Sequence, residues 1–436
     1  MNKLQQVLLR SKSVFIIWSM LAAFGTYFCM YAFRKPFNAG TYPGHQISGI
    51  DYKAILIVAQ VIGYMLSKFI GIKVISELKA SRRKPLIIGL ILFAEIALFL
   101  FGLVPAPYNF ICLFLNGLPL GMVWGVVFSY LEGRRFTEVL GMGLSISLII
   151  SSGFLKTIYF YIHALAPSIT EFWMPFVMGL LFLPLFLFFV WMLSVIPAPG
   201  KEDIALRKER LPMTGEDKRK VISQFGSALF VLIIVYTFLT MLRDFRDNFS
   251  VEIWNEMDPG WNKDVFAETE TIVGLIVLIV IACLSAIKSK AAGFWVTMLL
   301  IFIGVALSGV STLCFQFHWI SPFYWMLLLG IGLFFAYIPI QIVLFERMIA
   351  LFSIKANAGF FVYMCDSIGY LGSVGLLFYK EFFVKSMKWT KVLMQFSYLL
   401  SVVSMILLIL CAFLFYKQYY LSRQNSSNIK TAMQAV

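Results

Sequence analysis

Long apolar runs alternate with short polar segments along nearly the whole chain. An apolar run of about 20 residues is long enough to cross a bilayer as a helix, so the runs predict about twelve membrane helices. In the first half they lie at residues 14–33, 54–72, 85–104, 108–131, 139–163 and 172–196. In the second half they lie at 225–245, 271–287, 292–315, 322–345, 356–379 and 390–416. The predicted fold class is all-α, a polytopic membrane protein.

The first run is predicted to be a retained helix and not a cleaved signal peptide. Lys3, Arg10 and Lys12 precede it, as basic residues precede a signal peptide. The run is longer than the apolar region of a signal peptide, has no small-residue cleavage pattern and is followed by further spans.

The positions of the charged residues explain a net charge that could otherwise indicate a nucleic-acid partner. Hydrophobic residues make up 60% of the 436 residues and charged residues only 13%, yet the net charge is +14. Lys and Arg concentrate on alternate loops, the distribution that places those loops in the cytoplasm. We therefore expect no nucleic-acid partner, and both termini in the cytoplasm. One basic loop falls on the opposite side and does not fit: Lys380, Lys385, Lys388 and Lys391.

Sequence motifs of enzymes and metal sites are missing. The six cysteines all fall inside predicted spans without CxxC spacing, which indicates packing residues. The chain has no Gly-rich phosphate loop, no HExxH motif and no nucleotide fingerprint. We expect no enzyme activity, no cofactor and no metal site.

A polar stretch at 197–220, with three prolines, divides six predicted spans from six. This indicates two parallel pseudo-repeats, as in the major facilitator fold. Short echoes support it: Phe33-Arg34-x-x-Phe37 matches Phe245-Arg246-x-x-Phe249, and the Glu-Gly-Arg at 132–134 corresponds to the Glu-Arg at 346–347. The expected domains are a six-helix bundle at 1–196, a cytoplasmic linker at 197–224, a second bundle at 225–420 and a cytoplasmic tail at 421–436.

Two pairs of basic residues stand at the ends of equivalent spans. Arg34 and Lys35 end the first span, and Arg243 and Arg246 end the seventh. A basic residue at the centre of a membrane helix costs about 2.5–3.5 kcal/mol, and such residues usually face a cavity or mark a solute path. The planar guanidinium fork pairs bidentately with phosphate or carboxylate. The alternative is that they anchor the helix ends at the membrane surface, or that Asp244 and Asp247 neutralise the second pair.

The first two spans carry motifs of a known transporter branch. Span 1 contains Tyr31-x-x-Arg34-Lys35-x-Phe37, and span 2 contains Tyr-x-x-Ser-Lys-Phe ending in Lys68 and Phe69. These motifs resemble the organophosphate:phosphate antiporters of the major facilitator superfamily, which carry glycerol-3-phosphate and hexose phosphates.

The resemblance extends more thinly to other segments. Gly71, Glu77, Arg82 and Arg83 resemble a degenerate form of the superfamily's loop between spans 2 and 3, and a Gly-rich stretch in span 4 ends in Trp124.

The resemblance implies a substrate site. It implies that Arg34, Lys35 and Lys68 bind a phosphate-like group, and that Arg243 or Arg246 supplies the opposing arginine. Tyr31 and Trp124 are candidates for the cavity wall. The branch carries a histidine in helix 5 where our alignment places Ser151, so a relative of the branch with another anionic substrate is equally expected.

Three ionisable residues inside spans are candidates for coupling or gating: Lys156, Asp366 and Glu95. A buried ammonium needs a partner. We predict that Lys156 and Asp366 pair across the two halves in one access state and separate in another; a static pair is the alternative. Glu95 either takes part in proton movement or satisfies a donor of a neighbouring helix.

The sequence as a whole predicts a secondary active transporter of the bacterial inner membrane. Its substrate would be a small anionic organic metabolite, a class that includes phosphorylated metabolites. Transport would occur by rocking of the two halves about a site at the midplane of the membrane. Phosphate as counter-solute or a proton would supply the energy, and the protein is expected to be a monomer in lipid. The alternatives are a proton-coupled carrier of another organic solute, or a sensor or scaffold that binds its ligand without transport.

Overall fold

The computed structural model describes residues 3–76, 78–131, 137–198, 215–354, 356, 358–384 and 387–434. Within these residues, twelve helices are long and apolar enough to cross a membrane. The first six are α2 (Lys12–Ala32), α3 (Tyr52–Ser76), α4 (Ala80–Leu103), α5 (Phe110–Leu131), α6 (Thr137–Leu165) and α7 (Met174–Val195). The second six are α9 (Gly215–Asn248), α11 (Val265–Ser285), α12 (Lys290–Gln316), α13 (Pro322–Pro339), α15 (Ala358–Phe383) and α16 (Trp389–Gln434). The predicted all-α polytopic fold is confirmed.

Helix α13 continues without a break beyond its α-helical part. It passes through the π-helix η2 (Ile340–Leu344) into α14 (Phe345–Phe352), and the three together form one span. A π-helical turn inside a span is uncommon and is often found at functional sites.

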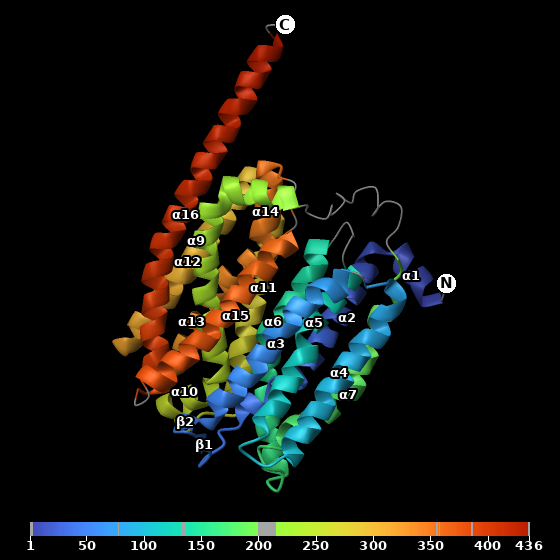
Figure 1. Ribbon diagram of the computed structural model, residues 1–436, viewed down its shortest axis with the longest axis vertical. Helices are drawn as coiled ribbons and strands as arrows, with labels where there is room; N and C mark the ends of the chain where they lie inside the picture. Colours follow the sequence, from blue (N-terminus) through green and yellow to red (C-terminus); the bar gives the residue numbers. More distant parts are fainter. Residues whose placement is uncertain are drawn as a thin grey trace.

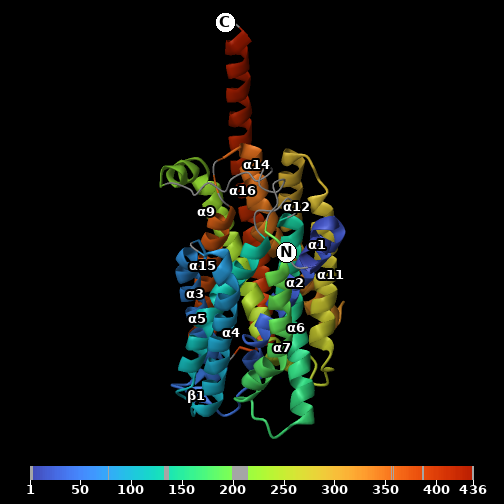
Figure 2. The same cartoon turned by 90° about the vertical axis from the view of Figure 1, so that its right-hand side faces the viewer.

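Short elements distinguish the two ends of the bundle. Helix α1 (Lys3–Arg10) lies at the end where both termini are found, which we call the termini end (Figure 1). The opposite end carries a hairpin of β1 (Gln46–Ile47) and β2 (Ile50–Asp51), the 3-10 helix η1 (Pro36–Ala39) and helix α10 (Ser250–Met257). We call it the hairpin end. Helix α16 extends far past the other helices at the termini end (Figure 2).

The two halves repeat one packing scheme. In each half the first helix packs against the fifth and sixth, the second against the fourth, and the third against the fourth and sixth. The halves meet mainly along two helix pairs, α6 with α11 and α3 with α15. The equivalent contacts in both halves support the pseudo-repeat.

Glycines allow α3 and α5 to approach closely. A Cβ added at Gly117 would lie 2.3 Å from the carbonyl oxygen of Gln60, and one at Gly63 would lie 2.2 Å from that of Phe114. Membrane helices have little hydrophobic force between them and associate through such close backbone packing. This contact fixes α3, which carries Lys68, against the rest of its half.

Two predicted boundaries differ from the structure. Helix α9 begins at Gly215, inside the predicted linker, with Glu216 and Asp217 in its first turn, where acidic side chains stabilise the helix dipole. Helix α16 continues through the predicted tail to Gln434. The rest of the linker, 199–214, lies outside the described residues.

The basic loop at the hairpin end has a structural explanation in part. Lys380 is buried, with its Nζ 4.2 Å from the ring centroid of Trp389 and 3.6 Å from Glu381. Glu256 of α10 accepts hydrogen bonds from the backbone N–H groups of Trp389 and Thr390, at 2.9 and 2.8 Å, and so caps α16. Lys380 is therefore buried against other side chains and is not part of an exposed basic loop.

Candidate functional site

Arg34 is a buried guanidinium without a counter-ion in the part of the chain that the structure describes. It follows the end of α2, and only 6% of the residue is exposed. Its Cζ lies 3.8 Å from the ring centroid of Tyr64 and 5.8 Å from that of Tyr31. Its Nε is buried and has no hydrogen-bond acceptor. The aromatic faces stabilise the cation, but its donors are available for an anion.

An amide network holds the backbone at Arg34. The Gln60 side chain donates to the carbonyl oxygen of Arg34 at 2.9 Å and to Asn116 Oδ1 at 2.8 Å. Asn116 in turn donates to the carbonyl oxygens of Phe33, at 3.0 Å, and Ala94, at 3.1 Å. The carbonyls left free where α2 ends are thereby satisfied, and the end of α2 is tied to α3, α4 and α5.

Lys68 and Asp366 form a buried ion pair between the halves. Lys68 lies on α3 and Asp366 on α15, and their side chains are in direct contact. Asp366 also accepts a hydrogen bond of 2.5 Å from the Tyr236 hydroxyl. The Lys68 Nζ lies 5.0 Å from the ring centroid of Tyr370 and 5.4 Å from that of Tyr64. The carboxylate thus occupies a position beside Lys68 that another anion could take.

Arg243 is the arginine of the second half that lies near the Lys68–Asp366 pair and its tyrosines. Its guanidinium lies 4.5 Å from the ring centroid of Tyr337 and donates to the Tyr337 hydroxyl. It also pairs with Asp244 at 2.7 Å and lies 5.7 Å from the ring centroid of Tyr370.

Two tyrosines join Arg34 to Arg243. The rings of Tyr64 and Tyr370 meet edge to face with centroids 5.3 Å apart. Since Arg34 lies against Tyr64 and Arg243 against Tyr370, the guanidinium groups of the two halves are linked through this pair.

Arg246 is engaged within its own half. It pairs with Glu270 at 2.7 Å and donates to the carbonyl oxygen of Met326 at 3.0 Å. The sequence left the choice between Arg243 and Arg246 open, and these contacts favour Arg243 as the opposing arginine.

Lys156 and Asp366 are not paired in this conformation, and their pairing in another access state stays a prediction. Lys156 instead pairs with Asp247 at 2.8 Å, and Asp366 with Lys68. The reason is depth: Asp366 lies about 12 Å along α15 from the termini end, whereas Lys156 lies about 29 Å along α6. Both residues reach the interface between the halves, but at different levels.

Asp247 is shared by two lysines of the first half. Its second oxygen pairs with Lys35 at 2.6 Å, and Lys35 also donates to Asn248 at 2.8 Å. Burial lowers the pKa of the Lys35 ammonium, and the Asp247 carboxylate opposes that shift. One carboxylate for two ammonium groups leaves this group with a positive charge in excess.

Further contacts join the halves at the hairpin end. Lys53, almost fully buried, pairs with Glu252 of α10 at 2.5 Å. Burial raises the pKa of Glu252, and the Lys53 ammonium opposes the shift. Glu381 accepts from the Asp51 backbone N–H at 3.1 Å. With the Asp247 pairs, these contacts join the two halves at the hairpin end.

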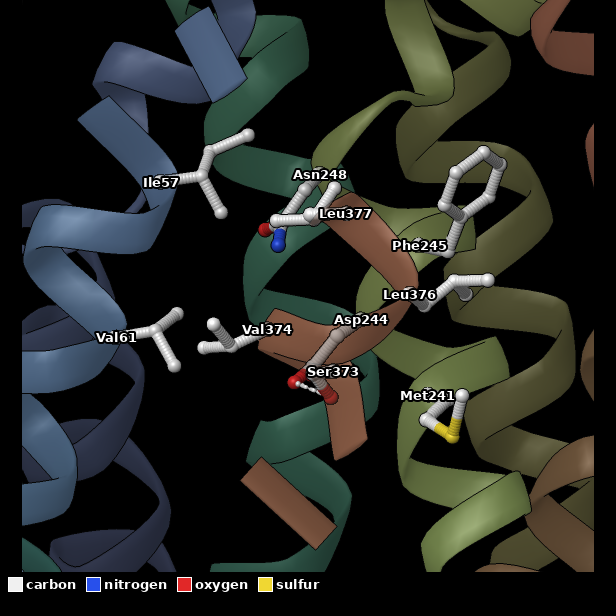
Figure 3. Close-up of a pocket in the computed structure, with 10 residues that line it drawn as sticks. All are labelled: Ile57, Val61, Met241, Asp244, Phe245, Asn248, Ser373, Val374, Leu376 and Leu377. Atoms are coloured by element: carbon white, nitrogen blue, oxygen red, sulfur yellow. Dashed lines mark hydrogen bonds between the residues drawn. The ribbon is translucent and has the colours of Figure 1, made fainter. Parts of the chain in front are cut away.

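A small cavity lies between α3, α9 and α15, next to these groups (Figure 3). Asp244 accepts a hydrogen bond of 2.8 Å from Ser373 at its wall, and the Asn248 side chain also lines it. The other lining residues are apolar: Ile57, Val61, Met241, Phe245, Val374, Leu376 and Leu377. The cavity connects the carboxylate beside Arg243 with the amide that binds Lys35.

The remaining predicted residues lie elsewhere. Trp124 stacks on Phe128, with centroids 4.9 Å apart, and none of the cation–π contacts between described residues joins it to Arg34 or Lys68. Glu95 lies where α4 meets α7, outside the cluster.

The predicted loop motif lies at the termini end, near α5. Gly71 packs against Met122, Arg83 lies 5.5 Å from the ring centroid of Tyr130, and Arg82 is exposed. Glu77 and the Glu-Gly-Arg at 132–134 lie outside the described residues.

The residues of the ion pairs described in this section, together with Arg34, carry an unbalanced charge. We call them the interface charge cluster: Arg34, Lys35, Lys53, Lys68, Lys156, Arg243, Arg246, Asp244, Asp247, Glu252, Glu270 and Asp366. Seven of these described residues are basic and five are acidic, an excess of two positive charges. An anion of matching charge would neutralise the cluster.

Sequence reasoning missed several of these residues. Lys53 and Glu252 stand at the edges of apolar runs, where charged residues usually face water, so they gave no signal. Tyr64, Tyr236 and Tyr370 could not be distinguished because aromatic residues make up 17% of the chain. For Asp247 the sequence offered only the alternative that it neutralises its neighbouring arginines, whereas it pairs with two lysines.

Solved structures with the same architecture belong to the major facilitator class of transporters. A bacterial homologue of the human drug peptide transporters PepT1 and PepT2 is 12% identical over 93% of this chain and 99% of its own, with a TM-score of 0.62. The nucleoside transporter NupG is 14% identical over 92% of this chain and 98% of its own, with a TM-score of 0.58. The tetrameric PepTSo2 is 12% identical over 94% and 100%, with a TM-score of 0.60. The predicted major facilitator fold is confirmed.

The chain itself belongs to a family of unknown function (DUF5690), whose model matches residues 36–418. No curated protein matches its sequence. The resemblance to organophosphate antiporters stays a prediction.

Proposed function

We propose that this protein is a secondary transporter that moves a small organic anion by alternating access between its two halves. The observation that carries the proposal is Arg34, buried without a carboxylate among the described residues. An unpaired buried charge is costly, and a guanidinium binds phosphate or carboxylate bidentately. Arg243 would supply the opposing cation from the second half.

The charge of the cluster supports a doubly charged substrate. An excess of two positive charges suits a phosphate monoester or a dicarboxylate better than a monocarboxylate, since a phosphate monoester carries about −1.5 to −2 at neutral pH. Asp366 would serve as the resident counter-ion of Lys68. The substrate would replace it there and so weaken a contact between the halves.

We infer the orientation from the distribution of basic loops. We place the termini end in the cytoplasm because most basic loops lie there, and the hairpin end outside the inner membrane. The conformation described here would then be closed toward the outside. A monomer provides both halves of the site.

A binding screen on the purified protein tests the proposal. We expect phosphate monoesters or dicarboxylates to raise the melting temperature more than monocarboxylates or neutral sugars do. Arg34→Ala should weaken that binding at least roughly tenfold, because loss of one charged partner costs about 2 kcal/mol or more. Arg10→Ala, an exposed arginine on α1, is the matched control and should bind as the wild type does.

Two results would contradict the proposal. Equal stabilisation of wild type and Arg34→Ala would remove Arg34 from the site. Binding without uptake of the same solute into proteoliposomes would favour the sensor or scaffold alternative.

A further inference from the structure

Glu95 is a buried carboxyl group that the interface charge cluster does not use. It lies in the middle of α4 and is only 6% exposed. Neither of its carboxylate oxygens has a hydrogen-bond partner among the described residues. It points at Gly179 of α7, where an added Cβ would lie 2.0 Å from its Oε2. The absence of a side chain at Gly179 is what makes room for it.

The helices around Glu95 offer it no positive charge. Helix α4 packs against α5 and α7, and neither contains a charged residue within its bounds. On α4 itself the nearest cation is Lys84, about 16 Å away along the helix. Glu171, which precedes α7, is a further carboxylate on that side, and it accepts from the backbone of Tyr42 at 2.6 Å. The titratable groups of α5 are the neutral side chains of Cys112, which is buried, and Tyr130.

These surroundings favour the protonated form of the Glu95 carboxyl group. An ionised carboxylate without a partner is far more costly in an apolar interior than a neutral one. We propose that Glu95 is a proton-binding site within the membrane, whose carboxyl group holds a proton between α4 and α7 and exchanges it when this contact loosens.

The position of Glu95 connects it to Arg34. The carbonyl oxygen of the adjacent Ala94 accepts a hydrogen bond from Asn116, and Asn116 binds Gln60, which holds the Arg34 carbonyl. Loss of the proton would charge the α4–α7 contact and force it open. The movement of α4 would then act on the network that fixes Arg34. This coupling rests on the proposed anion site, whereas proton binding itself does not.

Infrared spectroscopy of the protein in lipid nanodiscs tests proton binding without a transported solute. The wild type should show the carbonyl band of a protonated carboxylic acid, which loses intensity as the pH rises from about 5 to about 9, the range that covers buried glutamates. Glu95→Gln should lack this band. The matched control Glu268→Gln, at an exposed carboxylate of α11, should keep it.

Melting temperature gives a second readout. The wild type should lose stability as the pH rises, because a folded state that holds a proton is favoured at low pH. Glu95→Gln, which is neutral and of the same size, should lose this slope, and Glu95→Asp should keep the band and the slope. A band that is missing at every pH, or one that is constant from about pH 5 to about 9, would overturn the proposal. A pH response unchanged in Glu95→Gln would do the same. Failure of the anion screen would leave these results unaffected.

Discussion

Lys68 and Asp366 show how a single ion pair can join the two halves. Both side chains are buried, and the carboxylate has a second partner in Tyr236. Breaking a buried pair by removing one member leaves an uncompensated charge, which costs about 3–5 kcal/mol. The pair is therefore a sensitive point of the structure.

We predict that Lys68→Ala and Asp366→Ala each lower the melting temperature clearly, and that the double variant loses much less than the sum of the two. The physical reason is that the double variant buries no unpaired charge. Thermal unfolding of the four proteins in detergent forms a double-mutant cycle. Lys290→Ala, an exposed lysine, is the control and should melt near the wild type. Additive losses would show that the two residues act independently.

At this scale the sequence identified four buried cations of the first half but missed Lys53, and it did not identify their partners. Arg34, Lys35, Lys68 and Lys156 were all singled out, and the structure places all four at or near the interface between the halves. Partner choice depends on depth and helix rotation, which a run of apolar residues does not record. This is why Lys156 was assigned to Asp366.

At the scale of the element, the contact of α3 with α5 carries the most consequence for the site. It places Gln60, Tyr64 and Ser67 of α3 against the glycines of α5, and so fixes the helix that carries Lys68. Both helices could be predicted because a membrane span requires about 20 apolar residues. The close contact could not be, since glycine frequency alone does not say which helix faces it.

We predict that Gly117→Ala destabilises the protein and weakens anion binding. The added methyl group would lie 2.3 Å from the Gln60 carbonyl oxygen and 2.9 Å from the Tyr64 backbone nitrogen, so α3 must move. Overpacking of this kind costs about 1–3 kcal/mol. Melting temperature in detergent measures it. Gly89→Ala on α4, where a Cβ meets nothing within 4 Å, is the matched control. A stable Gly117→Ala variant would argue against the tight contact.

A third prediction concerns the end of α2. Asn116→Ala removes the donor to the Phe33 and Ala94 carbonyls and leaves them buried without a partner, which costs about 1–3 kcal/mol. We expect lower stability and weaker anion binding than in the wild type, as measured by thermal shift with and without the best anion of the screen. Full binding in this variant would show that Arg34 is positioned by other contacts.

At the scale of the molecule, the ion pairs between the halves have one polarity. In all four pairs that the described residues form across the interface, the lysine belongs to the first half and the carboxylate to the second: Lys35 and Lys156 with Asp247, Lys53 with Glu252, and Lys68 with Asp366. The sequence predicted two pseudo-repeats, and the repeated helix packing supports them. The sequence did not predict that the lysines lie on one half and the carboxylates on the other, because the pairing becomes visible only when the two halves are placed together.

The pairs at the hairpin end should hold this conformation closed. We predict that the double variant Lys53→Ala and Asp247→Ala shifts the population toward a conformation that is open at the hairpin end. Spin labels at Tyr108→Cys and Trp319→Cys, two exposed positions on opposite halves, should then report longer distances by pulsed electron paramagnetic resonance. The exposed Cys283 and the half-exposed Cys314 would be replaced by serine. An unchanged distance distribution would show that apolar packing alone maintains the closure.

The one-sided polarity of these pairs has a consequence for biosynthesis. The first half leaves the ribosome and enters the bilayer before any of its carboxylate partners has been translated. Until α9, α10 and α15 arrive, Lys35, Lys53, Lys68 and Lys156 lack the carboxylates with which they pair in the finished structure. A nascent first half would hold its lysines toward water or toward lipid phosphates, and it would become a finished bundle only on meeting its acidic counterpart.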